Sequence, residues 1–557
     1  MKIKKLLSQL VSNSIIESQV SKKLPNIDNF DVIIDRPKIA EHGDFSTNLP
    51  LILAKICKMS PQKISEIIIE NICSHKAINH VTFANPGFIN FFINNDYFYD
   101  ELKKIQSQGL DYFKNNYGRK QKLQLEFVSV NPTGPLHVGH ARGAVIGSSL
   151  SKILELSSYD VEREYYINDA GNQMRLFNHS LIERVKEIIN ENYKIVNISY
   201  PGEYLIDLAK NVIKELNLSE GSDLNSKNLE KITSLALSIT INNIKKTLEK
   251  LNVEFDSWFN ESKLLEDNFF QKIIKKLSED DLVFLKDGAK WFKGTKLGLE
   301  DDIVLIRSDD GGPTYFGTDL AYHYNKFLIR KFDKVINIWG ADHHSHVSRM
   351  YSILKAFEIN NQKLEIILNQ IVNFKNDGNS LKFSKRNNVL VTIDELIDEV
   401  GVDACRFIFL SRSPDTQMDF DLKLAKLQSS ENPVYYVQYA YARMCSIIRS
   451  AEIKQINFSN ANLNILTHKD EINLIKKLIQ LPEIILKCAQ MRQTHHITNF
   501  SMEFAKLLQK FYESCRVISE KEEEKDLSAS RLRLVENSKQ ALGYILEIMG
   551  MSKPEKM

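Results

Sequence analysis

The sequence is poor in cysteine, and its cysteines are not grouped. Six occur among 557 residues, and no two form a Cys-X-X-Cys pair. This scatter argues against a disulfide framework and against a structural zinc bound by cysteine. A reducing, cytoplasmic environment suits such a chain. The six positions are Cys57, Cys73, Cys405, Cys445, Cys488 and Cys515.

An excess of charge and long apolar runs are also missing. The 73 basic side chains nearly balance the 71 acidic ones, and the formal net charge is +2. Any contact with nucleic acid must therefore come from local patches. The apolar start of the chain is interrupted by Ser8 and Gln9, which favours an amphipathic helix over a signal peptide. No run reaches the length of a membrane-spanning helix, so we expect no membrane partner.

The composition that is present predicts a large soluble protein. Hydrophobic residues make up 43% of the chain and charged residues 26%, which is ample for well-packed cores. At ordinary domain sizes, this length corresponds to about three to five domains.

One stretch near residue 130 combines turn residues with two histidines. Residues 126–130 are prone to form a strand, and residues 131–135 (Asn-Pro-Thr-Gly-Pro) are rich in turn formers. Apolar residues after His140 recur at helical spacing, which predicts that His137 and His140 share one edge of the first helical turn. Unpaired N–H groups and the helix dipole favour phosphate there, and Gly139 admits a close ring system. Packing and capping alone could also explain the pattern.

A second stretch of interest lies far downstream. Residues 382–386 (Lys-Phe-Ser-Lys-Arg) follow a polar segment at 376–380, which comes after the strand-like segment 364–374. Lysine-rich loops are often merely solvated faces. Two lysines and a hydroxyl on such a loop can also close on pyrophosphate and neutralise the charge that develops as it leaves.

Together these two stretches resemble the paired signatures of class I aminoacyl-tRNA synthetases. The first resembles the HIGH signature, and its longer string resembles arginyl-tRNA synthetases in particular. The second resembles the KMSKS loop, with Phe383 in place of Met at a packing position. The likeness covers nearly the whole chain in order. The HIGH-like motif comprises Val130, Asn131, Pro132, Thr133, Gly134, Pro135, Leu136, His137, Val138, Gly139 and His140.

The resemblance implies an α/β fold: a Rossmann-like catalytic domain with a parallel sheet, an N-terminal α/β domain that contacts tRNA, and a C-terminal all-α bundle that binds the anticodon. The predicted boundaries are 1–117 for the N-terminal domain, 122–192 and 301–375 for the two catalytic halves, 193–300 for a connective insertion, 376–420 for the KMSKS-like loop and stem-contact segment, and 421–557 for the bundle.

Recognition of arginine is the sharpest expectation. A guanidinium is planar, permanently charged and presents a fork of donors, so its pocket needs carboxylates and aromatic faces. The resemblance places Tyr315 and Asp319 on the guanidinium. It assigns Glu126, Ser129 and Asn131 to the α-amino and carboxylate end, and it turns Asp169 and Gln173 toward the pocket. Asp169 could equally be a helix cap.

The resemblance also assigns the nucleotide and the catalytic groups. Gly340 and Asp342 suit ribose and adenine at a strand end. Three nearby histidines, His343, His344 and His346, do not predict zinc without further ligands. We expect ATP with Mg²⁺ as the substrate complex and no structural zinc. The ATP-binding set is His137, His140, Gly340, Asp342, His343, Lys382 and Lys385, and the catalytic set is His137, Gly139, His140, Lys382, Ser384 and Lys385.

For tRNA, the segment 432–443 interleaves tyrosines with Gln438 and Arg443. Most of the tyrosines are predicted to be bundle core, and Gln438 and Arg443 are the contact candidates. The implied function is activation of L-arginine by ATP to arginyl-adenylate, followed by transfer to tRNA(Arg), by a cytoplasmic monomer. Two alternatives remain open: a tRNA-binding protein of this fold without catalysis, and an enzyme of the class that charges another amino acid.

Overall fold

A computed structural model describes residues 2–37, 39–307, 311–376, 379–380 and 391–557. The chain divides into two compact units. The first unit comprises Met1–Tyr112, Ile447–Glu483 and Leu507–Gln540, and the second comprises Phe113–Ser446, Ile484–Lys506 and Ala541–Met557. Of the helices in the described ranges, none has both the length and the apolar character needed to cross a bilayer.

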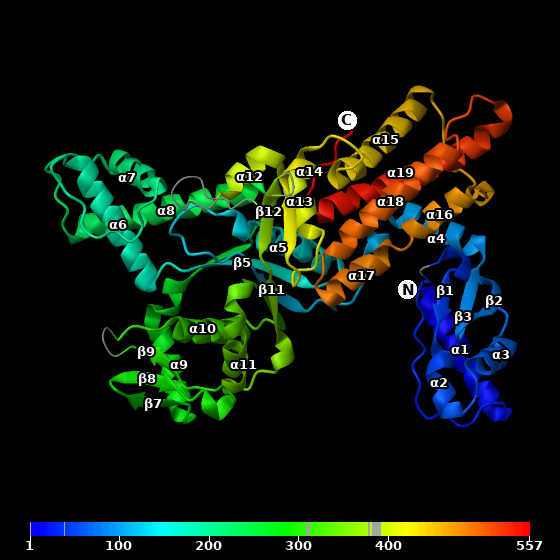
Figure 1. Cartoon of the computed structure of the whole chain (residues 1–557), viewed down its shortest axis with the longest axis horizontal. Helices are drawn as coiled ribbons and strands as arrows, with labels where there is room; N and C mark the ends of the chain where they lie inside the picture. The colour runs from blue at the N-terminus through cyan, green and yellow to red at the C-terminus, as the bar shows by residue number, and fades with distance from the viewer. Residues whose placement is uncertain (1, 38, 308–310, 377–378, 381–390) are drawn as a thin grey trace. The chain divides into compact units, whose positions relative to one another are not determined.

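The N-terminal part of the first unit packs helices around a small antiparallel sheet, as predicted (Figure 1). The sheet order is β1-β3-β2, and alternate residues of the central strand β3, Ile89, Phe91 and Ile93, are buried. The elements are α1 (Lys2–Val20), η1 (Ala40–His42), β1 (Phe45–Thr47), α2 (Leu49–Cys57), α3 (Pro61–Asn71), β2 (Ile78–Ala84), β3 (Phe88–Ile93), α4 (Asn95–Gln108) and η2 (Gly109–Phe113).

Residues from the last quarter of the chain complete this unit. Asp44 accepts from the Ile93 N–H at 2.9 Å and pairs with Lys476 at 2.6 Å. Tyr99 donates its buried hydroxyl to the Leu466 carbonyl at 2.6 Å. The His-Gly-Asp string at 42–44 therefore has a structural role. Elements in this part are η9 (Leu463–Ile465), α16 (Lys469–Leu478) and η10 (Glu522–Glu524).

A five-stranded, wholly parallel sheet forms the centre of the second unit, in the order β11-β10-β4-β5-β6. Its central strand is buried along both faces, with Leu123, Gln124 and Leu125 inaccessible, as expected when helices cover a parallel sheet. The strands are β4 (Lys122–Glu126), β5 (Asp160–Ile167), β6 (Ser257–Asn260), β10 (Lys334–Gly340) and β11 (Leu364–Asn369).

Helices pack on this sheet, and one of them also packs closely against a loop at the end of a strand. Helix α5 (Val138–Leu156) comes so close to the loop after β4 that a Cβ at Gly147 would lie 2.3 Å from the Phe127 ring. Buried apolar side chains of the sheet and of the surrounding helices form one large hydrophobic core. These elements are η3 (Glu261–Leu264), η4 (Glu266–Asn268), α9 (Phe269–Glu279), α10 (Tyr315–Tyr324), the π-helical turn η6 (Asn325–Ile329), η7 (Ala341–His346), α11 (Val347–Ala356) and η8 (Asn361–Lys363).

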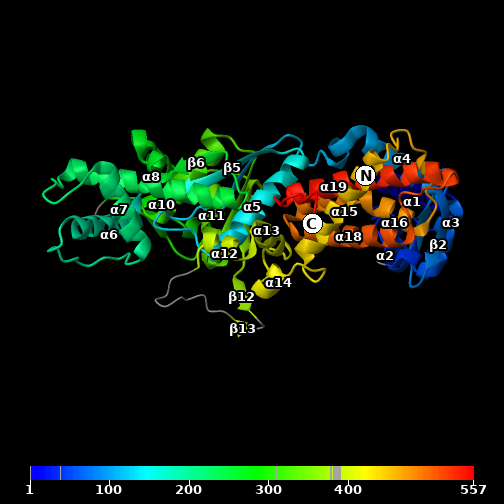
Figure 2. The ribbon, with the colours of Figure 1, turned by 90° about the horizontal axis from the view of Figure 1, so that it is seen from above.

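Two insertions interrupt the parallel sheet. Helices α6 (Gly171–Ile189), α7 (Glu203–Leu216) and α8 (Ser226–Lys250) lie side by side around their own apolar core (Figures 1 and 2). A separate antiparallel sheet, in the order β7-β8-β9, contains β7 (Val283–Lys286), β8 (Ala289–Phe292) and β9 (Ile303–Ile306). The short helix η5 (Thr295–Leu297) lies between β8 and β9 in the chain. Strand β9, expected to open the second catalytic half, therefore pairs outside the parallel sheet.

The rest of the second unit is mainly helical. A small sheet, β13-β12-β14, lies beside it, and the buried guanidinium of Arg142 from α5 donates to the carbonyls of Gln370, Ser413 and Thr416 at 2.8–2.9 Å. The remaining elements are β12 (Val372–Asn376), β13 (Asn379–Ser380), α12 (Ile393–Val400), α13 (Val402–Leu410), β14 (Met418–Asp421), α14 (Leu422–Lys426), α15 (Pro433–Ile453), α17 (Leu481–Met491), α18 (His495–Ser514) and α19 (Lys525–Ile548), the last four shared with the first unit.

One predicted boundary was wrong. The strand expected at residues 126–130 ends at Glu126, because the chain turns sharply directly afterwards. Val128 and Ser129 have positive φ angles of 68° and 44°. A β-branched residue in this region is strained, and such strain concentrates where backbone geometry serves a binding site.

Candidate active site

The candidate site lies at the carboxyl edge of the parallel sheet. Strands β4, β5, β6 and β10 all end there, since they run in the same direction. Loops at this edge lead into α5, η3 and η7, and ligands of open α/β sheets collect at such edges. Most of the side chains predicted to bind substrate are therefore brought to one region.

The two histidines of the HIGH-like motif cap α5 reciprocally. His137 is the N-cap, and its Nδ1 accepts from the Gly139 N–H at 3.2 Å. His140 accepts through its Nδ1 from the His137 N–H at 3.3 Å, and the two ring centroids are 3.5 Å apart. A Cβ at Gly139 would lie 2.9 Å from Cε1 of His137, so glycine is needed for this close stacking.

These contacts determine what the imidazoles can offer a ligand. Burial lowers the pKa of His137, and burial together with the neighbouring His137 lowers the pKa of His140 to about 3. Both rings are therefore neutral at pH 7. Because each Nδ1 accepts a backbone N–H, the proton of each ring is on Nε2. The pair thus presents two neutral N–H donors beside a helix N-terminus, an arrangement suited to phosphate oxygens.

Glu126 lies at the end of β4 with a buried cation beneath it. Nζ of Lys326, which is 0% exposed, lies 2.5 Å from Oε2 of Glu126 and 3.1 Å from Oδ1 of Asn337. Lys326 also lies 4.1 Å from the centroid of the Tyr322 ring. This carboxylate is therefore charged and held in one orientation within the site.

Two further carboxyls, Asp319 and Glu261, form no ion pair with any described residue, although the charges of Lys326 and Arg349 lower the pKa of Asp319 in part. Burial raises the pKa of Asp319 to about 7, with additional contributions from the charges of Glu126 and Glu261. Burial likewise raises the pKa of Glu261, which is 4% exposed, to about 7, despite a hydrogen bond from Tyr166 at 2.8 Å. Within the described chain, nothing donates a hydrogen bond to the Asp319 carboxyl. The region is therefore strongly attractive to a cation.

The other predicted arginine-binding residues include Tyr315, Asn131 and Ser129, and of these Tyr315 lies near Glu261. Tyr315 begins α10 one turn before Asp319 and is 51% exposed, and the charge of Glu261 contributes, after burial, to raising its pKa. Asn131 donates through its amide to Gln173. Ser129 accepts from the Tyr166 N–H at 3.1 Å.

The predicted nucleotide residues form a separate, more exposed group. Gly340 ends β10, and Asp342 and His343 follow in η7, with His343 Nε2 3.6 Å from Asp342 Oδ2. The predicted residues Lys382, Ser384 and Lys385 lie outside the described residues.

Comparison with known proteins matches three family models in order along the chain. Residues 2–93 match the arginyl tRNA synthetase N-terminal domain, residues 101–426 match the class I (R) tRNA synthetase catalytic domain, and residues 437–557 match the DALR anticodon binding domain. The catalytic model alone covers more than half of the chain. The chain belongs to the arginyl-tRNA synthetase family.

Relatives of this family match over the full length. Arginine–tRNA ligase of Dehalococcoides mccartyi strain BAV1 is 40% identical, with 100% of this chain and 99% of the relative aligned. The corresponding protein of Acetivibrio thermocellus is 41% identical over the same shares. Among solved structures, Thermus thermophilus arginyl-tRNA synthetase has a TM-score of 0.76 at 20% identity, covering 100% of both chains. Its identity is low, so this likeness speaks for the fold.

Sequence reasoning within the arginyl-tRNA synthetase pattern did not identify two charged residues of the site, Glu261 and Lys326. Glu261 directly follows β6, a position where a polar residue at the end of a parallel strand could have indicated it. Lys326 stands between Asn325 and the short apolar run Phe327-Leu328-Ile329, with Arg330 and Lys331 directly after it, so the local sequence contained no signal of a buried ion pair.

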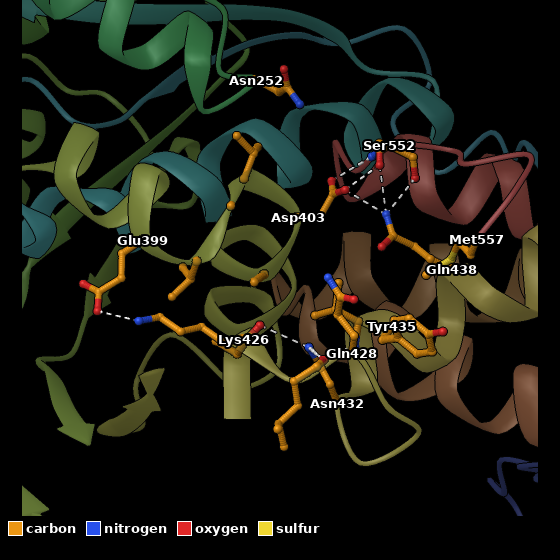
Figure 3. A pocket seen from close by; sticks show the side chains of 17 residues that line it. Asn252, Glu399, Asp403, Lys426, Gln428, Asn432, Tyr435, Gln438, Ser552 and Met557 are labelled. Carbon is orange, nitrogen blue, oxygen red and sulfur yellow. Dashed lines mark hydrogen bonds and ion pairs between the residues drawn. The ribbon is translucent and has the colours of Figure 1, made fainter. Parts of the chain in front are cut away.

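The tRNA candidates of this family member differ in accessibility. Gln438 is only 7% exposed, and its amide donates to Asp403 at 2.8 Å and to the Ser552 hydroxyl at 2.9 Å (Figure 3). It lines a pocket of about 700 Å³ that Tyr435 and Met557 also line. Arg443 donates to the Tyr439 hydroxyl at 2.8 Å. Most tyrosines of this segment were expected in the core, but Tyr435, Tyr436 and Tyr441 are half-buried and Tyr439 is exposed, so that prediction was wrong.

Proposed function

We propose that this chain is an arginine–tRNA ligase that activates L-arginine with ATP and transfers the arginyl group to the 3′ end of tRNA(Arg). The observation that supports arginine most directly is the pair of carboxyls without a cation, Asp319 and Glu261, near the already paired Glu126. A guanidinium would bring one delocalised positive charge between them and donate to each carboxyl through separate N–H groups.

In the proposed complex, Asp319 and Glu261 bind the guanidinium, and Tyr315 packs along it. Glu126, Ser129 and Asn131 address the α-amino and carboxylate end, with Gln173 beside Asn131. A lysine side chain carries one compact ammonium and cannot satisfy two separated carboxyls with a planar fork of donors. Leaving one buried carboxyl unsatisfied is costly, and this cost supports discrimination against lysine.

The chemistry requires no nucleophilic side chain. An oxygen of the arginine carboxylate attacks the α-phosphorus of ATP, the bond to the bridging oxygen breaks, and pyrophosphate leaves with that electron pair. A terminal ribose hydroxyl of tRNA then attacks the arginyl carbonyl, and AMP leaves. The Nε2–H groups of His137 and His140 would donate to phosphate oxygens as charge develops there. Mg²⁺ would enter with ATP, and Gly340, Asp342 and His343 would hold the nucleoside.

The roles proposed for Lys382, Ser384 and Lys385 are closure over the departing pyrophosphate, and Gln438 and Arg443 are proposed tRNA contacts. We also propose a cytoplasmic monomer. Free thiols at all six cysteines support a reducing compartment.

The deciding experiment is exchange of labelled pyrophosphate into ATP, driven by arginine, with and without tRNA(Arg). Lysine is the control amino acid, and Asp319→Asn is the control protein. We expect exchange with arginine and none with lysine. Equal exchange with lysine would overturn the assignment of arginine, and no exchange under any condition would overturn catalysis.

A further inference from the structure

Asp169 was predicted from the sequence to face the arginine pocket, but its carboxylate is already engaged. Oδ1 accepts from the Ser262 N–H at 2.9 Å. Oδ2 accepts from the Ser262 hydroxyl at 2.8 Å and from the Asn260 side-chain amide at 2.7 Å. Three donors to one carboxylate are a strong constraint on the segment that supplies them.

The segment held in this way contains Glu261. Asn260 and Ser262 are its two neighbours in the chain, so Asp169 holds both flanking residues, Asn260 through its side-chain amide and Ser262 through its backbone N–H. The carboxyl of Glu261 is fixed from the same strand, because Tyr166 of β5 donates to it at 2.8 Å. Ile167 of β5 pairs directly with Asn260 of β6, which places Asp169 just beyond the last paired residues of the two strands.

We propose that Asp169 is a positioning residue: it holds the turn from β6 into η3 so that the Glu261 carboxylate faces the guanidinium of arginine. This inference rests on the proposed function. Asp169 thus acts on arginine through Glu261 and also adds a second negative charge near it.

That second charge gives the proposal a distinct signature. Groups facing Glu261 are Tyr166 and Asp169 from β5 and the segment after it, and Asp319 and Tyr315 from α10. Burial is the main reason that the pKa of Glu261 is raised, and the charge of Asp169 raises it further. Removing this charge while keeping the shape should therefore lower the pKa of Glu261.

The test is Asp169→Asn in the full-length enzyme, assayed by arginine-dependent pyrophosphate exchange. The asparagine NH2 must take the place of one carboxylate oxygen and would face a donor there, either the Ser262 N–H or the Asn260 amide, so the turn should loosen. Because hydrogen bonds to a charged group are lost, we expect the arginine KM to rise about tenfold. The kcat and the KM for ATP should stay within about twofold of the wild-type values. The acid limb of kcat/KM for arginine should move to lower pH.

A double-mutant cycle separates positioning from direct contact. If Asp169 acts through Glu261, adding Asp169→Asn to Glu261→Gln should raise the arginine KM less than about twofold further. A full tenfold penalty in both backgrounds would overturn the proposal and make Asp169 a direct ligand. A fall in kcat with the arginine KM unchanged would also overturn it.

Asp256→Asn is a matched control. Asp256 links β5 and β6 at their other end, where it accepts hydrogen bonds from Arg163 at 2.7 and 2.9 Å. The substitution Asp256→Asn should therefore leave the arginine KM unchanged. An equal effect there would show that any tie between these strands matters, which contradicts the proposal. Should Asp169→Asn fail to fold, Ser262→Ala removes one donor and should raise the arginine KM about threefold; no rise would count against the proposal. Wild-type enzyme without arginine-dependent exchange would instead refute the proposed function.

Discussion

Two sets of carboxyl groups along the same parallel sheet have opposite environments. Glu164, within β5, is inaccessible and is bound by Arg330 at 2.6 and 2.9 Å and by the Ser257 hydroxyl at 2.6 Å. Burial alone would raise its pKa, but these partners hold the pKa below its usual value. Asp319 and Glu261, at the carboxyl edge, form no ion pair with the described residues, and burial raises the pKa of each to about 7.

The difference separates a structural charge from a functional one. A buried carboxylate that already has its guanidinium can only stabilise or orient the fold. A buried carboxylate without an ion-pair partner destabilises the ligand-free protein. It contributes favourably to the free energy of the protein only when a cation binds beside it. Arg330 thus shows, within this chain, the kind of group that Asp319 and Glu261 lack. In the proposed complex, the substrate arginine supplies that group.

Breaking the paired set should have the largest effect on stability. In Glu164→Gln, the buried end of Arg330 loses its carboxylate, and such losses cost about 3 to 5 kcal/mol. Urea unfolding of the ligand-free enzyme should show this decrease in the free energy of unfolding of the catalytic unit. The arginine KM of the folded fraction should stay near that of the wild type. A loss below about 1 kcal/mol would mean that the pair is not structural.

Breaking the unpaired set should affect substrate instead. Asp319→Asn removes a charge-assisted contact with the guanidinium, which should cost about 2 to 3 kcal/mol in kcat/KM for arginine. Steady-state pyrophosphate exchange measures it.

Stability should change in the opposite direction from that of Glu164→Gln. Ionising the wild-type Asp319 at pH 8 is unfavourable in the folded state, so the asparagine variant should be at least as stable there. If Asp319→Asn instead unfolds as readily as Glu164→Gln, the distinction between the two sets fails.

The pH dependence sharpens the same comparison. Asp319 and Glu261 bind protons below about pH 7 in the free enzyme, whereas a guanidinium requires their charged forms. Arginine affinity should therefore rise about tenfold between pH 6 and 8 for each proton released. Calorimetric titration in buffers of different ionisation enthalpy counts these protons.

Asp319 and Glu261 also determine the direction in which the stability of the ligand-free enzyme changes with pH. Their pKa values are higher folded than unfolded, so the folded state holds more protons between about pH 4 and 7. Stability of the free enzyme should fall as pH rises through 7, and saturating arginine should abolish that fall. A pH-independent affinity without proton release would contradict both expectations.

Much of this site could be predicted from the sequence, but which of its carboxylates are paired with a cation could not. The two signatures and several strands follow from local patterns, and the resemblance to the synthetase family predicted that Tyr315, Asp319 and Glu126 share one pocket. Glu164 and Arg330 are 166 residues apart, and no periodicity connects them. Which carboxylate has a cation depends on the packing of α10 and η6 against the sheet. The strained turn at Val128 and Ser129 could not be predicted either, since Val128 favours strands locally and neither residue type indicates a positive φ angle.

The smallest effect is expected at Glu162, which contacts the same Arg330 from the edge of β5. Its side chain is 30% exposed, compared with none for Glu164, so water screens the pair and replaces it readily. Glu162→Gln should lower the free energy of unfolding by less than about 1 kcal/mol and leave arginine kinetics unchanged. Urea unfolding of this variant, run beside Glu164→Gln, compares two carboxylates on one guanidinium that differ mainly in burial. Equal losses would show that proximity to Arg330, and not burial, sets the cost of breaking a pair in this sheet.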